Sequence, residues 1–184
     1  MFVVRGDSPA RNVRDLVGKP VAWGVPSSGL TLQGQYIMDG LGLDRDKDFT
    51  ARFLDKAGDG AGLVLGGEVA ALWGAGLGWP NFTKVMQAGG RFIGFTAEEV
   101  AKVGAKHPFL KPMTLPAGAY EGQAEPITTL GVWSYILSRP DLPDDTAYRL
   151  AKALQDGHAV LAARLPRRRR PPPKTPRPRL RTPR

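Results

Sequence analysis

The residues best placed for chemistry in this 184-residue chain lie in a Gly/Ser loop at positions 24–31, with the sequence G-V-P-S-S-G-L-T. Its spacing matches the phosphate-binding motif G-x-x-x-x-G-K-[ST] except that Leu30 replaces the lysine. Without that charge, nucleotide hydrolysis is not expected. A helix start and nearby hydroxyl groups still suit a small carboxylate, although Ser28 alone could serve only as a helix cap. The predicted binding residues here are Ser27, Ser28, Gly29 and Thr31.

A second Gly-rich loop, which contains Trp79, follows a predicted strand at 69–73 that ends in Trp73. Loops after the strands of α/β folds often contact ligands, so Gly76, Trp79 and Asn81 are further candidates for solute contact. Core packing explains Trp73 equally well. The glycines between positions 58 and 67 do not fit G-x-G-x-x-G in any phase, and a dinucleotide site is therefore not predicted.

Side chains suited to catalysis are few. The chain has two histidines, His107 and His158, and neither stands in a serine–acid pattern or at metal-ligand spacing. The absence of cysteine excludes disulfides and thiolate chemistry. We therefore predict no catalytic residue, no metal, no cofactor and no enzymatic activity, with an enzyme of unrecognised type as the third alternative. The mixed-charge run at 44–48 is interpreted as a solvated loop.

The net charge of +9 comes from one end of the chain. Residues 167–184 hold eight Arg and one Lys without an acidic residue, so 17 basic and 17 acidic side chains are left for the preceding residues. We expect residues 166–184 to be a disordered tail. One interpretation is out-of-frame translation of GC-rich DNA. The alternative is a polybasic arm that binds nucleic acid or an anionic membrane, although no specific nucleic acid is expected.

Apolar periodicity predicts the elements that must position these loops. Strands are expected at 2–4, 21–23, 49–54, 69–73, 83–87, 91–95 and 128–137, and helices at 30–41, 98–105 and 144–158. Residues 58–67 are expected to form a loop and residues 112–122 to be irregular. Alternating strands and helices predict an α/β fold with a largely parallel sheet, formed by residues 1–165.

Three blocks of sequence resemble the TAXI family of solute-binding proteins. The first is D-L-x-G-K-x-V at 15–21 with G-x-P-x-S-G at 24–29. The second is H-P-F at 107–109 with L-P-A-G-A-Y-x-G-Q at 115–123. The third is T-T at 128–129 followed by R-P-D-L-P-D-D-x-x-Y-x-L-x-K-A-L at 139–154. The blocks stand in family order over about residues 3–165.

This resemblance implies a lobe of a type II periplasmic binding protein that serves as the receptor subunit of a TRAP-type secondary transporter. The implied partners are a small carboxylate solute, such as an amino acid or dicarboxylate, and the membrane subunits of the transporter. The implied location is the periplasm, although the sequence begins without a recognisable signal peptide. The family's N-terminal lobe has no counterpart here and Leu30 stands where the family usually has threonine, so we expect an incomplete cleft and weak binding.

Overall fold

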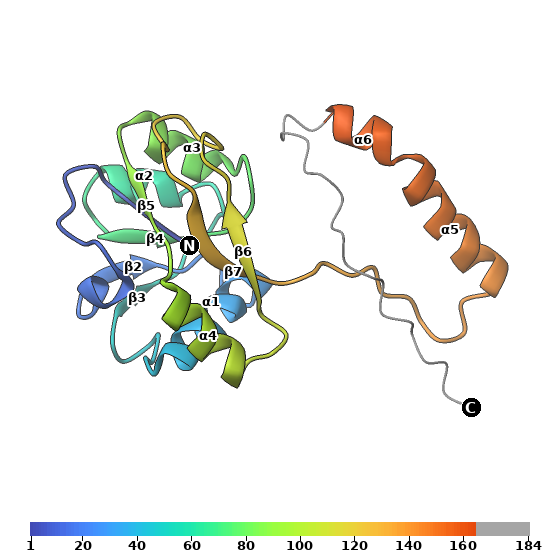
Figure 1. The fold of residues 1–184 in the computed structure, drawn as a ribbon, viewed down its shortest axis with the longest axis horizontal. Coiled ribbons are helices and arrows are strands. Elements are labelled where there is room, and N and C mark those ends of the chain that lie inside the picture. Colours follow the sequence, from blue (N-terminus) through green and yellow to red (C-terminus); the bar gives the residue numbers. More distant parts are fainter. Residues whose placement is uncertain (165–184) are drawn as a thin grey trace. The chain divides into compact units, whose positions relative to one another are not determined.

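The computed structural model describes residues 1–164, so the predicted tail lies outside the described residues. The chain divides into a unit formed by Met1–Ser138 and a second unit that begins at Arg139. The first unit contains a mixed five-stranded sheet with helices on both faces (Figure 1). The predicted α/β fold is therefore confirmed, and every candidate binding residue lies in this unit.

The strand order of the sheet is β3-β2-β4-β1-β5. Strand β2 pairs in parallel with both β3 and β4, whereas β1 is antiparallel to β4 and β5. The expectation of a largely parallel sheet is therefore wrong: the sheet is mixed, because β1 runs against both of its neighbours. The strands are β1 (Phe2–Val4), β2 (Pro20–Ala22), β3 (Thr50–Arg52), β4 (Ala71–Trp73) and β5 (Arg91–Ile93).

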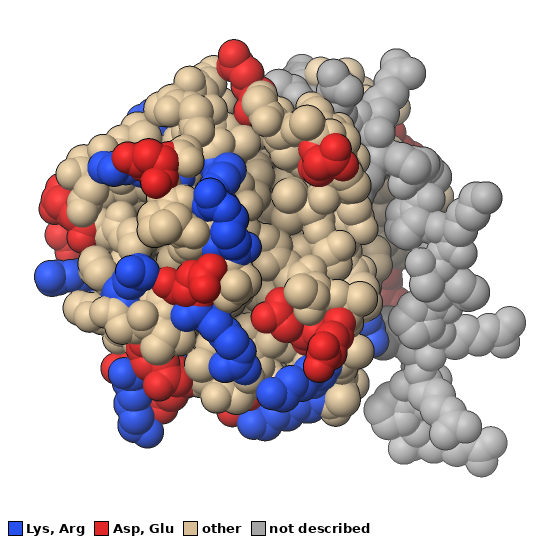
Figure 2. All heavy atoms as spheres, turned by 60° about the vertical axis from the view of Figure 1, so that its left-hand side comes forward, with Lys and Arg blue, Asp and Glu red and all other residues tan. Residues whose placement is uncertain are grey.

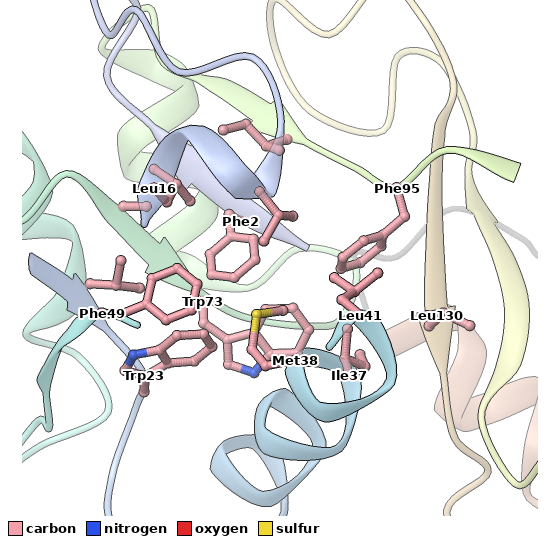
Figure 3. Packing of buried hydrophobic residues seen from close by; sticks show 14 of the residues in the cluster. Phe2, Leu16, Trp23, Ile37, Met38, Leu41, Phe49, Trp73, Phe95 and Leu130 are labelled. Atoms are coloured by element: carbon pink, nitrogen blue, oxygen red, sulfur yellow. The ribbon is translucent and has the colours of Figure 1, made fainter. Parts of the chain in front are cut away.

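Alternating side chains of the strands build two hydrophobic clusters, one on each face of the sheet. Successive residues of a strand point to opposite faces, so Phe2 and Val4 enter one cluster while Val3 enters the other. Trp23 and Trp73 are fully buried in the first cluster, where the Phe2 ring lies between strands and helix (Figure 3). Burial of each such side chain stabilises the fold by about 1.5–3 kcal/mol.

Helices cover both faces of the sheet (Figure 1). Helices α1 (Gly29–Leu41) and α4 (Ala97–Lys106) pack together over the first cluster. At Gly40 a Cβ atom would lie 2.9 Å from the Val103 Cα atom, so glycine is what permits this close packing. Helices α2 (Gly60–Leu65) and α3 (Pro80–Gln87) cover the other face. A 3-10 helix at Val13–Leu16 precedes β2.

Two expectations for this second face are wrong. The glycine-rich stretch 58–67 was expected to be a loop, yet it contains α2, where Gly60 permits contact with Leu72, whose side chain would lie 2.7 Å from an added Cβ. Residues 83–87 were expected to be a strand, yet they belong to α3. Pro80 starts that helix, and Phe82, Val85 and Met86 give it a buried face at helical spacing.

A separate hairpin pairs β6 (Lys111–Leu115) with β7 (Ile127–Gly131). The expectation that residues 112–122 are irregular is therefore wrong for their first part. The strand expected at 128–137 ends early, because the register stops at the pair Lys111 and Gly131. Beyond it, Tyr135, Ile136 and Leu137 are 77%, 77% and 88% exposed. These side chains do not contribute to the described core.

The described part of the second unit consists of α5 (Asp144–Asp156) and α6 (His158–Arg164). Asp144 and Asp145 occupy the first turn of α5, where negative charge suits the helix dipole. The amphipathic helix predicted at 144–158 is confirmed over Asp144–Asp156, and none of its residues is buried. It ends at Gly157, and His158 begins α6. Within residues 1–164, no helix is long and apolar enough to cross a bilayer.

Acidic and basic side chains alternate over the face of the molecule in Figure 2. Neither sign gathers there into a single patch. This agrees with the equal numbers of basic and acidic residues that the sequence gives outside the tail. On that face the surface itself therefore offers no broad electrostatic field, and any preference for an anion has to come from local groups.

Candidate functional site

Three loops meet at one edge of the sheet. Strands β2, β3 and β4 are parallel neighbours, so their carboxyl ends lie at the same edge. The loops that follow them begin at residues 23, 53 and 74. In open α/β sheets this edge is where ligands usually bind. Both loops that the sequence singled out are therefore at the edge expected for a binding site.

The loop after β2 ends in a capped helix start. Ser28 is the N-cap of α1, and its hydroxyl accepts a hydrogen bond of 3.2 Å from the Thr31 amide. The amides of Gly29 and Leu30 donate to no other described residue. First-turn amides of a helix lack partners within the helix, and together with the dipole they favour an anion. Two N–H donors are thus available at this helix start.

The loop holds Ser27 in a strained conformation. Its φ angle is 62°, and it is the one non-glycine among the described residues with a positive φ. Such a conformation costs a non-glycine residue roughly 1–2 kcal/mol and persists where the surrounding structure enforces it. Ser27 is also exposed. Strain on an exposed polar residue directly before a helix start is typical of binding loops.

Thr31 has a different role from the other two hydroxyl residues. Its side chain is 5% exposed, and Oγ1 lies 3.1 Å from the Trp23 carbonyl and 2.8 Å from the Val25 carbonyl. The same oxygen is 2.9 Å from Ser28 Oγ. The Thr31 hydroxyl therefore ties the loop to the helix and has little capacity left for a solute.

These residues line a pocket of about 360 Å³ on the flank of α1. One side of the helix forms its floor, because positions 28, 31, 32 and 35 repeat at helical spacing. The volume suits a small molecule. The lining residues are Pro26, Ser27, Ser28, Gly29, Thr31, Leu32, Gln35, Arg45 and Phe53.

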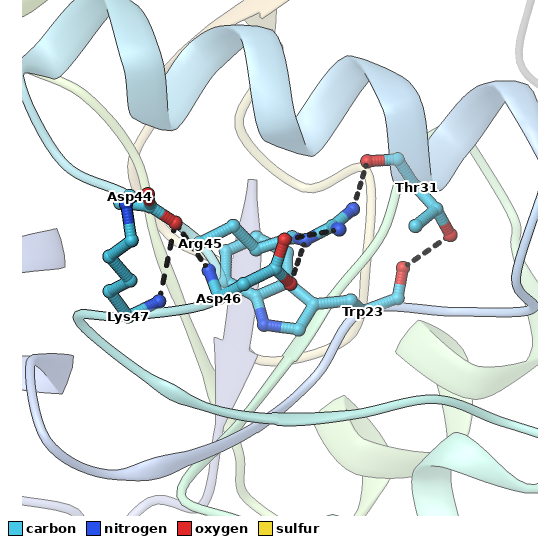
Figure 4. Close-up of polar contacts among 6 residues, drawn as sticks. All are labelled: Trp23, Thr31, Asp44, Arg45, Asp46 and Lys47. Atoms are coloured by element: carbon cyan, nitrogen blue, oxygen red, sulfur yellow. Dashed lines mark hydrogen bonds and ion pairs between the residues drawn. The ribbon is translucent and has the colours of Figure 1, made fainter.

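Five pocket residues were not among the candidates: Pro26, Leu32, Gln35, Arg45 and Phe53. Of these, Arg45 and Phe53 come from outside the Gly/Ser loop and α1. Arg45 belongs to the run 44–48, which was expected to be solvated, but its side chain is only 11% exposed. The guanidinium lies 5.2 Å from the centre of the Phe53 ring and pairs with Asp46 at 2.9 Å. Its Nη1 donates to the Thr31 carbonyl at 3.4 Å (Figure 4). The sequence alone could not reveal this, because the contacts come from different elements.

The rest of this run behaves as a solvated turn. Lys47 is 83% exposed and pairs with Asp44 at 2.9 Å (Figure 4). The hydrogen bond from Lys47 is the main cause that holds the pKa of Asp44 below its ordinary value, and the Asp46 amide adds to the effect. These contacts shape the turn that carries Arg45 to the pocket.

The candidates of the second loop do not line this pocket. Asn81 is 2% exposed, and its side chain donates to the Ala57 carbonyl at 2.5 Å and accepts from the Ala61 amide at 3.1 Å. Trp79 packs edge-on against Phe82, with ring centres 4.9 Å apart. Gly76 is exposed with a φ of 90°, and its carbonyl accepts from a tyrosine of the hairpin loop. The structure gives Asn81 a role in joining α2 to α3.

Neither histidine is among the residues that line the pocket. Nε2 of His107 is 2.6 Å from a carboxylate oxygen of Asp39, and Lys106 binds the other oxygen at 2.7 Å. These two contacts, Lys106 before His107, lower the pKa of Asp39. They join the end of α4 to α1. His158 is the first residue of α6.

The first unit is thus a mixed α/β structure with a pocket at the carboxyl ends of its parallel strands. The chain belongs to the NMT1-like family, whose model matches residues 1–164. This match extends over both described units.

Solved structures of binding proteins are similar to the chain. One is the periplasmic aliphatic sulphonate binding protein SsuA from Escherichia coli, with a TM-score of 0.48 and 18% identity over 88% of this chain and 47% of that chain. Another is the substrate binding protein of an amino acid ABC transporter, with a TM-score of 0.46, 12% identity and coverage of 88% and 55%.

A third similar structure is a putative sulfonate ABC transporter periplasmic sulfonate-binding protein SsuA from Methylobacillus flagellatus KT. It has a TM-score of 0.35 and 25% identity over 39% of this chain and 21% of that chain. The chain therefore spans about half or less of the length of these proteins. What a whole protein of this kind binds and delivers is a matter of proposal for this chain.

Proposed function

We propose that this chain is a solute-binding lobe of a transporter receptor and that it holds a small carboxylate at the start of α1. The observation that carries the proposal is the pair of unpaired amides at Gly29 and Leu30 beside the pocket. A carboxylate has two acceptor oxygens and can accept from both amides at once. The helix dipole adds about 0.3–1 kcal/mol. The Ser27 hydroxyl supplies a further donor, whereas the Ser28 hydroxyl donates to Thr31 Oγ1.

The proposal includes no chemistry on the bound solute. A binding lobe needs donors and a shaped wall, and the pocket offers both. The proposed substrates are amino acids and dicarboxylates, and the proposed location is the periplasm. The resemblance of the three sequence blocks to the TAXI family supports membrane subunits of a TRAP-type transporter as partners. Gly76 and Trp79 remain proposed contacts at the same sheet edge, while the bonding of Asn81 favours a supporting role.

Weak binding is expected of the pocket. Ser27 and Gly29 are exposed, so hydrogen bonds to the solute compete with water. Millimolar affinity corresponds to about 4 kcal/mol and micromolar affinity to about 8 kcal/mol. Two or three exposed hydrogen bonds of about 1 kcal/mol each, with the dipole, reach the first value and not the second.

Nuclear magnetic resonance tests the binding proposal, because it detects millimolar affinity. Succinate, glutamate and 2-oxoglutarate are titrated into the ¹⁵N-labelled chain, and the amide signals of Gly29 and Leu30 are expected to shift more than those of other residues. Shifts centred elsewhere, or none at millimolar acid, would contradict the proposed site. For the transporter class, uptake of labelled solute by cells that carry the gene should depend on an ion gradient and persist when ATP is depleted.

A further inference from the structure

The inference concerns Arg45 and rests on the proposed function, since it names what the same pocket selects. Arg45 is the one charged residue among the described residues that line the pocket. It comes from the turn after α1, and Phe53 comes from the end of β3. The residue therefore reaches the helix start from outside the Gly/Ser loop. Its side chain is only 11% exposed, so the charged guanidinium is largely shielded from solvent.

Arg45 has donor groups to spare. A guanidinium carries five N–H groups. Asp46 accepts from Nε and from Nη2, both at 2.9 Å, and the Thr31 carbonyl accepts from Nη1. These three bonds leave two N–H groups, one on each terminal nitrogen, without a described partner. Two adjacent N–H groups of a guanidinium match the two oxygens of a carboxylate.

Two contacts hold the guanidinium in place before any solute arrives. The Phe53 ring lies beside it at 5.2 Å, and the Thr31 carbonyl fixes one terminal nitrogen. A guanidinium that is already positioned loses little conformational freedom on binding, so more of the interaction energy becomes affinity. Asp46, whose side chain is 52% exposed, reduces the local positive charge through a bidentate pair with Arg45.

We propose that Arg45 selects the charge of the solute by donating its two remaining N–H groups to a carboxylate of the ligand in the pocket. The pocket then distinguishes an acid from a neutral molecule of the same shape. Asp46 acts against the acid because its carboxylate competes for the same guanidinium. Removing Arg45 should lower the affinity for an acid about tenfold, because a charge-assisted hydrogen bond is lost; tenfold corresponds to about 1.4 kcal/mol.

The test compares succinate with succinamide, its neutral analogue, by the same titration in wild-type chain and variants. Arg45→Gln is expected to lose about tenfold in affinity for succinate and to bind succinamide like the wild type. Arg45→Lys keeps the positive charge but lacks the planar guanidinium, so its affinity for succinate should lie between those of the wild type and Arg45→Gln. Asp46→Asn should bind succinate more tightly. Arg52→Gln is the matched control, because it removes an exposed charge that does not line the pocket, and it should behave like the wild type.

The outcomes separate this inference from the proposed function. If Arg45→Gln and the wild type bind succinate equally at Gly29 and Leu30, the role of Arg45 is overturned while the anion site at the helix start stands. If neither acid nor amide shifts the pocket signals in the wild type, both proposals fail. Equal loss of succinate and succinamide affinity in Arg45→Gln would indicate altered packing and would also overturn charge selection; Arg45→Lys, which keeps most of the side chain, then serves as the second check.

Discussion

The loops at 24–31 and 74–81 lie at the same edge of the sheet but differ in the surroundings of their side chains. Each follows one of two adjacent parallel strands and leads into a helix. The first lines a pocket with polar groups. In the second, Asn81 is buried and Trp79 packs on Phe82. A loop at the carboxyl edge of the sheet is therefore not a binding site by position alone. Whether a pocket forms beside the loop depends on which side chains occupy the space next to it.

The neighbour that fills this space is Tyr120 from the loop between β6 and β7. Its hydroxyl donates to the Gly76 carbonyl at 2.8 Å and accepts from the Trp79 amide at 3.1 Å. The ring also packs edge-on against Phe92, with centres 5.1 Å apart. The Trp79 amide of the second loop is thus satisfied by the protein, whereas the amides of Gly29 and Leu30 have no described partner.

Backbone conformation separates the two loops in the same way. The second loop takes positive φ at Gly76 and Gly78, where glycine adopts it without strain. The first loop takes it at Ser27 as well as at Gly24. A side chain kept at a strained position has to be compensated by other interactions, whereas a glycine there does not. The strain at Ser27 supports the role proposed for the first loop.

The largest effect is expected from Asn81→Ala in the second loop. The change removes both hydrogen bonds of a buried amide and leaves the Ala61 amide and the Ala57 carbonyl without their partner. We expect a loss of about 2–4 kcal/mol in the free energy of unfolding, measured by urea denaturation. If Asn81 instead contacts the solute, the variant will keep its stability and lose succinate binding, which would remove the contrast between the loops.

Tyr120→Phe tests the group that closes the second loop. The substitution keeps the ring and removes only the hydroxyl, so the Gly76 carbonyl and the Trp79 amide lose a shared partner. The expected destabilisation is about 1–2 kcal/mol, measured in the same way. Tyr36→Phe is a control, because Tyr36 is 37% exposed and makes ring contacts only with His107 and Phe109 among the contacts described. Equal stability of both variants would argue that the hydroxyl of Tyr120 is dispensable.

Ser28 offers a variant that separates capping from binding. Ser28→Ala should destabilise the chain by about 1 kcal/mol through loss of the cap. Ser28→Asp should keep the cap, since aspartate is an equally good N-cap residue, and still abolish succinate binding by repulsion. Thermal denaturation and the titration together give the answer. Unchanged succinate binding by the aspartate variant would place the anion elsewhere.

The smallest effect is expected from Ser27→Gly. Relief of the positive φ favours the variant by about 1 kcal/mol, and the greater freedom of glycine in the unfolded chain offsets part of this gain. The variant should therefore be as stable as the wild type or slightly more stable by urea denaturation. A clear loss of stability would mean that the Ser27 side chain holds the loop together and that its strain has a structural origin.

The sequence predicted the parts of the fold in which local pattern and burial agree. The strands near residues 2–4 and 91–95, the 30–41 helix and its cap at Ser28 are confirmed, because alternation or helical spacing matches the buried face. Helix α3 was missed because Val85 and Thr83 favour strands by propensity, and packing against the sheet overrides that preference.

For the candidate site, the sequence could indicate the start of a helix but not which residues of other elements lie beside it. Ser27, Ser28, Gly29 and Thr31 come together because they are neighbours in the chain, and their role in binding stays a prediction. Arg45 and Phe53 meet only through the pairing of β2 with β3 and the turn after α1. Thr31 was expected to face the solute. Nothing in the sequence reveals that its hydroxyl lies within hydrogen-bond distance of two backbone carbonyls.

The reversed strand β1 has a consequence for how the chain reaches this structure. Phe2 pairs with Trp73 on one side and with Ile93 on the other, so the middle of the sheet closes only after distant segments have met. Strands β2, β3 and β4 with their connecting helices can assemble from more local contacts. High contact order of this kind slows folding, because the entropy cost of closing the long loop comes before the stabilising strand pairing forms. Until β1 inserts, the inner edges of β4 and β5 are open to pairing with other chains.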